Sequence, residues 1–253
     1  MSKFTFNLDH VVVVVSNLEQ ATEQFRGLGF TVSLGGTNGP THNALITFQD
    51  RTYIELISAR SGSLRCFFWL LYTTKLVYLF KPIMSPLSFR FFCWLGGPTG
   101  IRDWCIKVGQ LKNIIDLLRA NNTLISGSEK FTRNKPNLEI AKWFLAAPND
   151  QRLPFFIQDI TDAAIRIPSG DATNHSNGCI GISRLLLNEK VYSSMMESIA
   201  FLNHQVSITK NNSSQTEVQL VDDLDGHIAI ELVGLESKLK VLQMKQKQGP
   251  KLL

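Results

Sequence analysis

The stretch "LDHVVVVVSNLEQATEQFRGLGF", residues 8–30, decides what fold to expect. Its five consecutive valines predict a β-strand, because β-branched side chains pack well on a pleated sheet and lose rotamer freedom in a helix. Asn17 then suits a helix N-cap, with Leu18, Ala21 and Phe25 at helical spacing behind it. Three strand candidates follow, in "FTVSL", "HNALITF" and "TYIELIS", so the order is β-α-β-β-β.

This order recurs along the chain. The stretch "RDWCIKVGQLKNIIDLLRANN" aligns with the opening without a gap and places Asp103 on His10, and the strands "LEIAKWFLAA" and "LPFFIQDI" complete that unit. A third unit runs from "CIGISRLLLNEKVYSSMMESIAFL" through "QVSIT", "TEVQLV" and "HIAIELVG". The repeat predicts an α+β protein of βαβββ modules. We expect one domain over residues 5–160, with modules at 5–58 and 100–160, then a third module at 176–235 and a basic tail at 236–253.

Residues 64–98 interrupt the repeat. Between Cys66 and Gly96 this aromatic insert has ten aromatic residues and three cations, but no acidic residue. The cations and two prolines leave no uninterrupted apolar run of spanning length, so stable membrane insertion is not favoured. Three interpretations stay open: a hydrophobic lid or partner surface, an element lying on a membrane surface, or sequence foreign to the domain.

Composition excludes several classes of protein. The chain has 253 residues, of which 44% are hydrophobic and 19% charged, as in globular proteins. Its net charge of +5 comes largely from the tail, and no basic–aromatic motif supports nucleic-acid binding. The four cysteines form no CxxC pair and no signal peptide precedes the first strand, so we predict free thiols and a cytoplasmic location.

The repeat, with His10 in a first strand and Glu55 within "IEL" in a last strand, resembles the glyoxalase / bleomycin-resistance / extradiol-dioxygenase superfamily, in its glyoxalase-like branch. The resemblance implies that paired modules form a curved mixed sheet around an open cup. It also implies metal ligands on the first and last strands, holding a divalent ion such as Zn, Fe, Mn or Ni, and no organic cofactor. Such an ion would polarise a carbonyl of a small substrate or activate oxygen.

Carried over residue by residue, the resemblance gives an incomplete ligand set. His10 and Glu55 match the first module, and Glu231 matches the last strand of the third. Asp103 is the counterpart of His10 in the second module, whose last strand offers Gln158 in place of glutamate. In the third module the position of His10 falls on Gly181 or Ile182, neither of which binds metal. The candidate site residues are therefore, for metal, His10, Glu55, Asp103 and Glu231; for catalysis, Glu55 and Glu231; for substrate binding, Asn43 and His175.

Each candidate also has an ordinary structural interpretation, as a strand-edge, turn or solvent-facing residue. The leading functional hypothesis is a glyoxalase-like small-molecule enzyme with lyase, isomerase or dioxygenase chemistry. The alternative is a metal-free binding protein that sequesters a small molecule in the same cup, and a weaker one is an interaction module that docks through the aromatic insert. An odd number of modules leaves the third either beside the first two or paired with another chain, as a homodimer.

Overall fold

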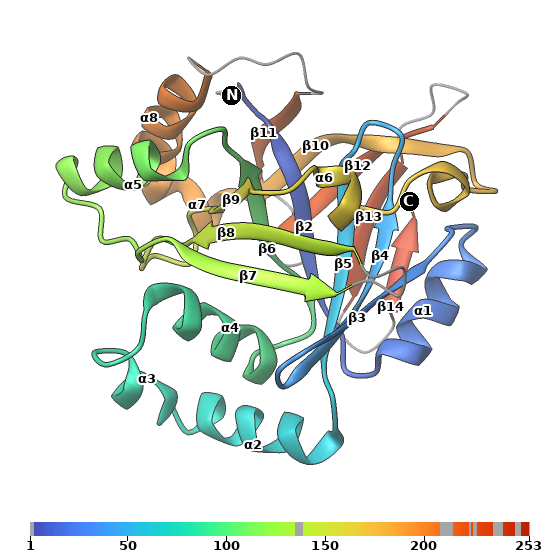
Figure 1. The fold of residues 1–253 in the computed structure, drawn as a ribbon, viewed down its shortest axis with the longest axis horizontal. Coiled ribbons are helices and arrows are strands. Elements are labelled where there is room, and N and C mark those ends of the chain that lie inside the picture. The colour runs from blue at the N-terminus through green and yellow to red at the C-terminus, as the bar shows by residue number, and fades with distance from the viewer. Residues whose placement is uncertain are drawn as a thin grey trace.

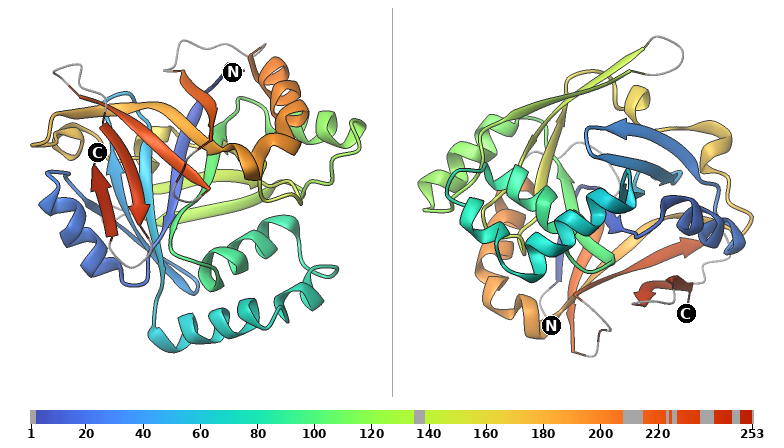
Figure 2. Two further views of the ribbon diagram at one scale, coloured as in Figure 1. Left: turned by 180° about the vertical axis from the view of Figure 1, so that it is seen from behind. Right: turned by 90° about the horizontal axis from the view of Figure 1, so that it is seen from below.

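The computed structural model describes residues 3–134, 139–207, 215–222, 224, 227–234, 240–245 and 249–252. Two sheets lie back to back, with helices at their flanks (Figures 1 and 2). The larger sheet has eight strands in the order β3-β4-β5-β2-β6-β9-β8-β7, and the smaller has six in the order β1-β11-β10-β12-β13-β14. The α+β class and the curved mixed sheet of βαβββ modules are confirmed.

The eight-stranded sheet consists of two modules joined at their first strands. In each module the first strand runs parallel to the last, β2 to β5 and β6 to β9, and β2 and β6 pair antiparallel at the centre. The first module comprises β2 (Leu8–Val14), α1 (Leu18–Gly27), β3 (Ser33–Asn38), β4 (Thr41–Thr47) and β5 (Tyr53–Ala59). The second comprises β6 (Gly100–Lys107), α5 (Leu111–Ala120), β7 (Glu129–Asn134), β8 (Ile140–Ala146) and β9 (Phe155–Asp159).

The start of the first module forms as its sequence predicts. The Asn17 side chain accepts a hydrogen bond from the backbone N–H of Gln20 at 2.8 Å, which caps α1. After the helix, Gly29 adopts a φ of +85°, a left-handed conformation that glycine takes without a steric penalty. The valines alternate across β2, so that Val11 and Val13 enter the main core while Val12 and Val14 lie on the opposite face.

The main core fills the space between the two sheets. Apolar side chains of β2, β5 and β6 pack there with the apolar faces of α1 and α5 and with β10 and β12 of the smaller sheet. The opposite, concave face of the larger sheet carries a second apolar cluster, which includes Trp94 and Leu87 from the aromatic insert. The larger sheet is therefore covered on both faces.

The last third of the chain pairs its strands differently. It comprises β10 (Cys179–Asn188), α7 (Glu189–Tyr192), α8 (Met196–Ser207), β11 (Thr216–Val221), β12 (Ile228–Gly234), β13 (Lys240–Lys245) and β14 (Gly249–Leu252). Here β10 runs parallel to β11, the next strand along the chain, and antiparallel to β12. At the other edge β1 (Lys3–Phe6) pairs with β11. One expectation fails in this part: residues 205–207 of "QVSIT", which the sequence suggests as a strand, belong to α8, while Ile208 and Thr209 lie outside the described residues. Within the basic tail, residues 240–245 and 249–252 form β13 and β14.

The aromatic insert folds into helices against the concave face of the larger sheet. It forms α2 (Gly62–Thr73), α3 (Val77–Phe80) and α4 (Pro86–Gly96), with α4 between the sheet and α2 (Figures 1 and 2). The Ser61 and Ser85 side chains cap α2 and α4, and Pro86 occupies the first turn of α4, where no N–H is needed. None of the helices in the described part of the chain has the length and hydrophobicity that crossing a bilayer requires.

A short helix and two 3₁₀ turns complete the connections. Helix α6 (Ala163–Arg166) follows β9, and the 3₁₀ turns lie at Gly170–Thr173 and Ser193–Met195. All four cysteines are free thiols, as predicted, and Cys66 is the exposed one.

Candidate functional site

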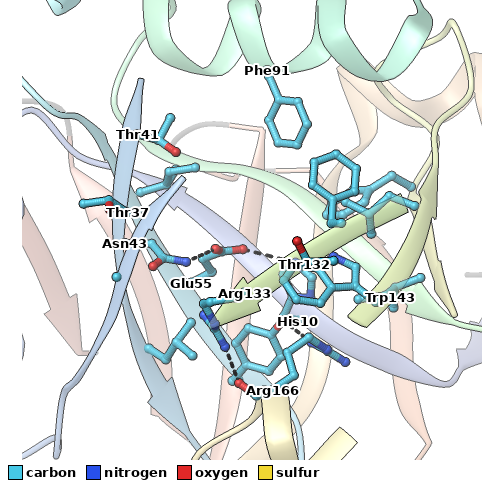
Figure 3. A pocket seen from close by; sticks show the side chains of 18 of the residues that line it. His10, Thr37, Thr41, Asn43, Glu55, Phe91, Thr132, Arg133, Trp143 and Arg166 are labelled. Carbon is cyan, nitrogen blue, oxygen red and sulfur yellow. Dashed lines mark hydrogen bonds and ion pairs between the residues drawn. The ribbon is translucent and has the colours of Figure 1, made fainter. Parts of the chain in front are cut away.

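The concave face of the larger sheet encloses a cavity of about 110 Å³ (Figure 3). A dry apolar cavity of roughly 150 Å³ holds a benzene molecule, so this space suits a small organic molecule. The first module supplies mostly polar lining, from β2, β3, β4 and β5, while the second module and α4 supply an aromatic wall. That wall consists of Phe91, Trp94, Phe131, Trp143 and Phe155.

His10 lies at the floor of this cavity and is held on three sides. Its Nδ1 donates to Oδ1 of Asp9 at 2.7 Å, its ring stacks on Tyr53 with centroids 4.5 Å apart, and the Phe155 ring meets it edge-on. With Nδ1 donating to Asp9, Nε2 is the ring nitrogen that faces the cavity. A histidine on an ordinary strand edge has no such support, so the site-residue interpretation of His10 is favoured.

A β-bulge explains why Asp9 reaches His10. Adjacent side chains on a regular strand point to opposite faces, but the register between β2 and β6 shifts between Leu8 and His10. Both Asp9 and His10 are consequently buried in one cluster with Cys105. Sequence periodicity alone could not predict this irregularity.

Glu55 faces His10 across the cavity. Its Oε2 lies 3.5 Å from Nε2 of His10, and its Oε1 accepts a hydrogen bond from Nδ2 of Asn43 (Figure 3). Glu55 shares a face of β5 with Tyr53 and Ile57, so that its side chain enters the cavity as strand alternation predicts. The structure thus brings together three of the predicted site residues, His10, Glu55 and Asn43.

Two arginines line the cavity, and sequence reasoning missed both. Arg166, at the end of α6, donates to both oxygens of Asp9, to both oxygens of Asp159 and to the Tyr53 hydroxyl, so its charge is fully compensated. Burial is the largest single influence on Asp9 and opposes its ionisation, but the charge of Arg166 and the hydrogen bonds from His10 and Arg166 together lower the Asp9 pKa far below its usual range. This network fixes the carboxylate that orients His10.

Arg133, on β7, differs from Arg166 in having no carboxylate partner within the described residues. Its Nη1 donates to the Gly35 carbonyl at 3.3 Å, its Nη2 donates to the Arg166 carbonyl, and its guanidinium lies 5.9 Å from the centroid of the Trp143 ring. These neutral contacts hold the guanidinium beside the cavity without cancelling its charge. Arg133 is therefore a positive group available to an anionic ligand.

The other predicted site residues lie elsewhere. Asp103 does not line the cavity, because α4 covers it: both its oxygens accept from Arg90, and Oδ2 also accepts from Nε1 of Trp94 at 3.0 Å. Glu231 is on β12 of the smaller sheet, where it pairs with Arg184 at 3.0 Å. The sequence also predicts a turn at Asp225 and Gly226, before Glu231, but these two residues lie outside the described residues. We leave Asp103 and Glu231 out of the site.

His175 has a structural role, because its ring joins the segment before β10 to the first module. Its Nδ1 accepts from the backbone N–H of Thr31 at 3.0 Å and its Nε2 donates to the Thr47 carbonyl at 3.1 Å. Burial lowers the His175 pKa, which keeps the ring neutral as both bonds require. It does not line the cavity, so the structure does not bring it together with His10 and Glu55.

The His10–Glu55 pair has the spacing of two ligands on one ion. With bonds of about 2.1 Å and a near-tetrahedral angle, ligand atoms lie about 3.4 Å apart, close to the 3.5 Å between Nε2 and Oε2. Asp9 behind Nδ1 is the outer carboxylate that metal-binding histidines commonly have. However, the facing residues of the second module, Phe155 and Ile157, carry no donor atoms, so solvent or substrate would complete the coordination.

A second group of potential ligand atoms lies behind His10. Asp9, His10 and Cys105 each place one such atom within 4.8 Å of the others. Asp9 already pairs with the Arg166 guanidinium, which would repel a cation there. Burial raises the Cys105 pKa well above its ordinary value, so its sulfur stays protonated and binds metal poorly. This group is better explained as support for the imidazole ring.

Several solved structures are similar to this chain, to different degrees. A hypothetical protein from Staphylococcus aureus superposes with a TM-score of 0.58 and 15% identity, covering 96% of this chain and 87% of that one. The Mn(II)-bound glyoxalase from Novosphingobium aromaticivorans gives 0.45 and 8%, covering 95% and 82%. Methylmalonyl-CoA epimerase from Mycobacterium tuberculosis gives 0.38 and 17%, covering 60% and 86%. The comparison with curated proteins finds no match. The glyoxalase-like domain model matches residues 8–200, and the chain belongs to that family.

Proposed function

We propose that this protein is a glyoxalase-like enzyme that moves a proton on a small organic anion bound in the cup. The observation that carries the proposal is the facing of Nε2 of His10 and Oε2 of Glu55 at 3.5 Å inside the cavity. Both are potential proton acceptors, held by Asp9 and Asn43 behind them. A pair of acceptors aimed at one small space is suited to take a proton or to share a cation.

In this proposal Glu55 is the general base. A substrate C–H next to a carbonyl loses its proton to Oε2, and Asn43 keeps the carboxylate aimed at the cavity through Oε1. The proton can pass to Nε2 of His10, because Asp9 stabilises the imidazolium that would result. Return of the proton to a different position gives isomerase chemistry, and loss of a leaving group gives lyase chemistry.

A divalent ion (Zn, Fe, Mn or Ni) held by His10 and Glu55 would supply Lewis-acid polarisation of a substrate carbonyl. Oε2 of Glu55 can either bind this ion or accept a proton from the substrate, but it cannot do both at once. The test therefore includes measurements with and without metal. The dioxygenase hypothesis stays a prediction that loading with iron under air would check.

Arg133 and the aromatic wall define the substrate class. The guanidinium would bind a carboxylate or phosphate, and Trp143 and Phe155 would pack on an apolar or planar part of the molecule. A charge-assisted hydrogen bond contributes about 1.5–3 kcal/mol, so Arg133→Met should raise the ligand Kd by about 10- to 100-fold.

The test is hydrogen exchange in D₂O, followed by NMR, on a panel of small 2-oxo and 2-hydroxy acids. Wild-type protein should exchange the C3 proton of at least one 2-oxo acid or the C2 proton of at least one 2-hydroxy acid, and Glu55→Gln should slow that exchange about 100-fold or more. Glu23→Gln is the matched control, since Glu23 is exposed on α1. Each protein is measured after EDTA treatment and after loading with Zn, Mn, Ni or Fe. Equal exchange rates in wild type and Glu55→Gln would refute the proposal.

The metal-free binding protein remains the second candidate, supported by the aromatic half of the cavity. It predicts that the NMR signals of aromatic acids in the panel broaden or shift when the protein is added. No acid should exchange a carbon-bound proton under any of the metal conditions. The two candidates are therefore separated by one data set.

A further inference from the structure

We propose that α2 and α3 form a docking face for an anionic lipid bilayer surface, to which the protein attaches peripherally. This inference concerns the outer side of the aromatic insert and goes beyond the chemistry of the cup. Of the twelve exposed large hydrophobic residues in the described part of the chain, eight lie within residues 67–83. We call this set the apolar face; it consists of Phe67, Trp69, Leu70, Leu76, Tyr78, Leu79, Phe80 and Ile83.

The apolar face results from how the insert packs. Helix α4 turns its own apolar residues toward the sheet, and α2 contributes little more than Phe68 to the interior. The outer side of α2 and the α3 turn then project away from the body of the molecule (Figures 1 and 2). Leu79 is 71% exposed and Ile83 is 81% exposed, and the exposure of so many apolar side chains in one segment is unfavourable in water.

The charges around this face select the partner. No acidic residue occurs between Glu55 and Asp103, whereas Arg65, Lys75 and Lys81 lie within or beside the apolar face. Aromatic side chains interspersed with lysines, without acids, are typical of elements that lie in the headgroup region of anionic membranes. Lys81 also lies over the Phe89 ring, 5.4 Å from its centroid, which holds its stem beside α4.

A second copy of the chain fits this face less well. A two-fold dimer would place the same surface on both sides, so the lysines of one copy would approach the lysines of the other with no carboxylate between them. An anionic bilayer supplies the opposite charge and an apolar interior at once. Helix α4 lies between α2 and the larger sheet, and no residue of α2 or α3 lines the cavity, so the apolar face is separate from the cup.

The experiment is co-sedimentation of the full-length protein with vesicles. We expect binding to phosphatidylcholine vesicles that contain 30% phosphatidylserine, weaker binding in 0.5 M salt, and little binding to pure phosphatidylcholine. Lys75→Gln with Lys81→Gln should weaken binding about 30-fold, at roughly 1 kcal/mol for each cation. Leu79→Glu with Ile83→Glu should abolish it.

Leu124→Glu is the matched control, because Leu124 is 73% exposed and lies outside the apolar face. It should bind vesicles like the wild type, and thermal unfolding should show that every variant is folded. Two results would overturn the proposal. One is no binding to either vesicle at low salt. The other is a wild-type dimer in light scattering that Leu79→Glu with Ile83→Glu converts to a monomer, which would identify a second copy as the partner.

Discussion

Arg90 on α4 is the residue whose removal tests whether the aromatic insert is part of the folded protein. Its side chain is 0% exposed and pairs with Asp103, itself 1% exposed, at 2.9 Å. It also donates to the carbonyls of Pro148, Asp150 and Leu153. A single side chain thus ties the insert to β6 and to the loop before β9.

The substitution Arg90→Met keeps most of the side-chain volume and leaves Asp103 as a buried carboxylate without its cation. Breaking such a pair costs about 3–5 kcal/mol, because the remaining charge is desolvated and uncompensated. For a chain of this size the cost corresponds to a fall of roughly 6–20 °C in Tm. Urea unfolding followed by circular dichroism measures the difference, with the exposed Arg119→Met as the matched control.

The pH dependence adds a second readout. Burial, the largest influence, raises the pKa of Asp103 despite the opposing charge of Arg90, and removing Arg90 should raise it further. A carboxyl group with a higher pKa in the folded state binds more protons there than in the unfolded state. Stability is therefore lost as the pH rises above the ordinary value of 3.8, and the deficit of Arg90→Met should be smaller at pH 4 than at pH 7.

Neutralising the stranded acid should recover part of the loss, so Arg90→Met with Asp103→Asn should be more stable than Arg90→Met alone. A cost below 1 kcal/mol for Arg90→Met would refute the reasoning, since it would mean that α4 does not cover Asp103. The insert would then have to be interpreted as sequence foreign to the domain.

Two further predictions concern residues outside the cup. The Gln158 side chain accepts a hydrogen bond from the backbone N–H of Leu111 at 2.7 Å, at the start of α5. Gln158→Leu should therefore lower the free energy of unfolding in urea by about 1 kcal/mol without changing the affinity for a ligand of the cup. A changed Kd for that ligand would place Gln158 in the site after all. Burial lowers the His175 pKa, so the folded state resists its protonation, and wild-type stability should fall as the pH drops below about 6.5. His175→Gln should flatten that dependence, and an unchanged pH profile would contradict the assigned neutral ring.

Local patterns predicted the modules well because local physics forms them. The valine run, the Asn17 cap and the strand alternation of Glu55 each depend on neighbours a few residues away. The gapless alignment of Asp103 with His10 identified the second module, and the structure pairs the first strands of the two modules, β2 and β6, at the centre of one sheet. What it could not reveal is that an arginine from the insert neutralises Asp103.

The features that the sequence did not predict depend on contacts between distant parts of the chain. The pairing of β10 with β11 is a choice among several possible strand partners, which hydrophobic alternation does not distinguish. Gln158 occupies a last strand, as expected, but its side chain caps α5 instead of entering the cup. Arg133 and Arg166 enter the site from β7 and α6, where no local motif marks them.

The pairing of β1 with β11 also bears on how this protein is made. Lys3 lies opposite Gln219, while the following strand, β2, belongs to the other sheet. On the ribosome the two modules of the larger sheet can assemble early, but β1 must wait for a partner synthesised more than 200 residues later. Until then its backbone N–H and C=O groups are an open edge that another strand can occupy. The six-stranded sheet is therefore the last part of the fold to close. Until it closes, the unpaired edge of β1 is where a chaperone would protect the nascent chain.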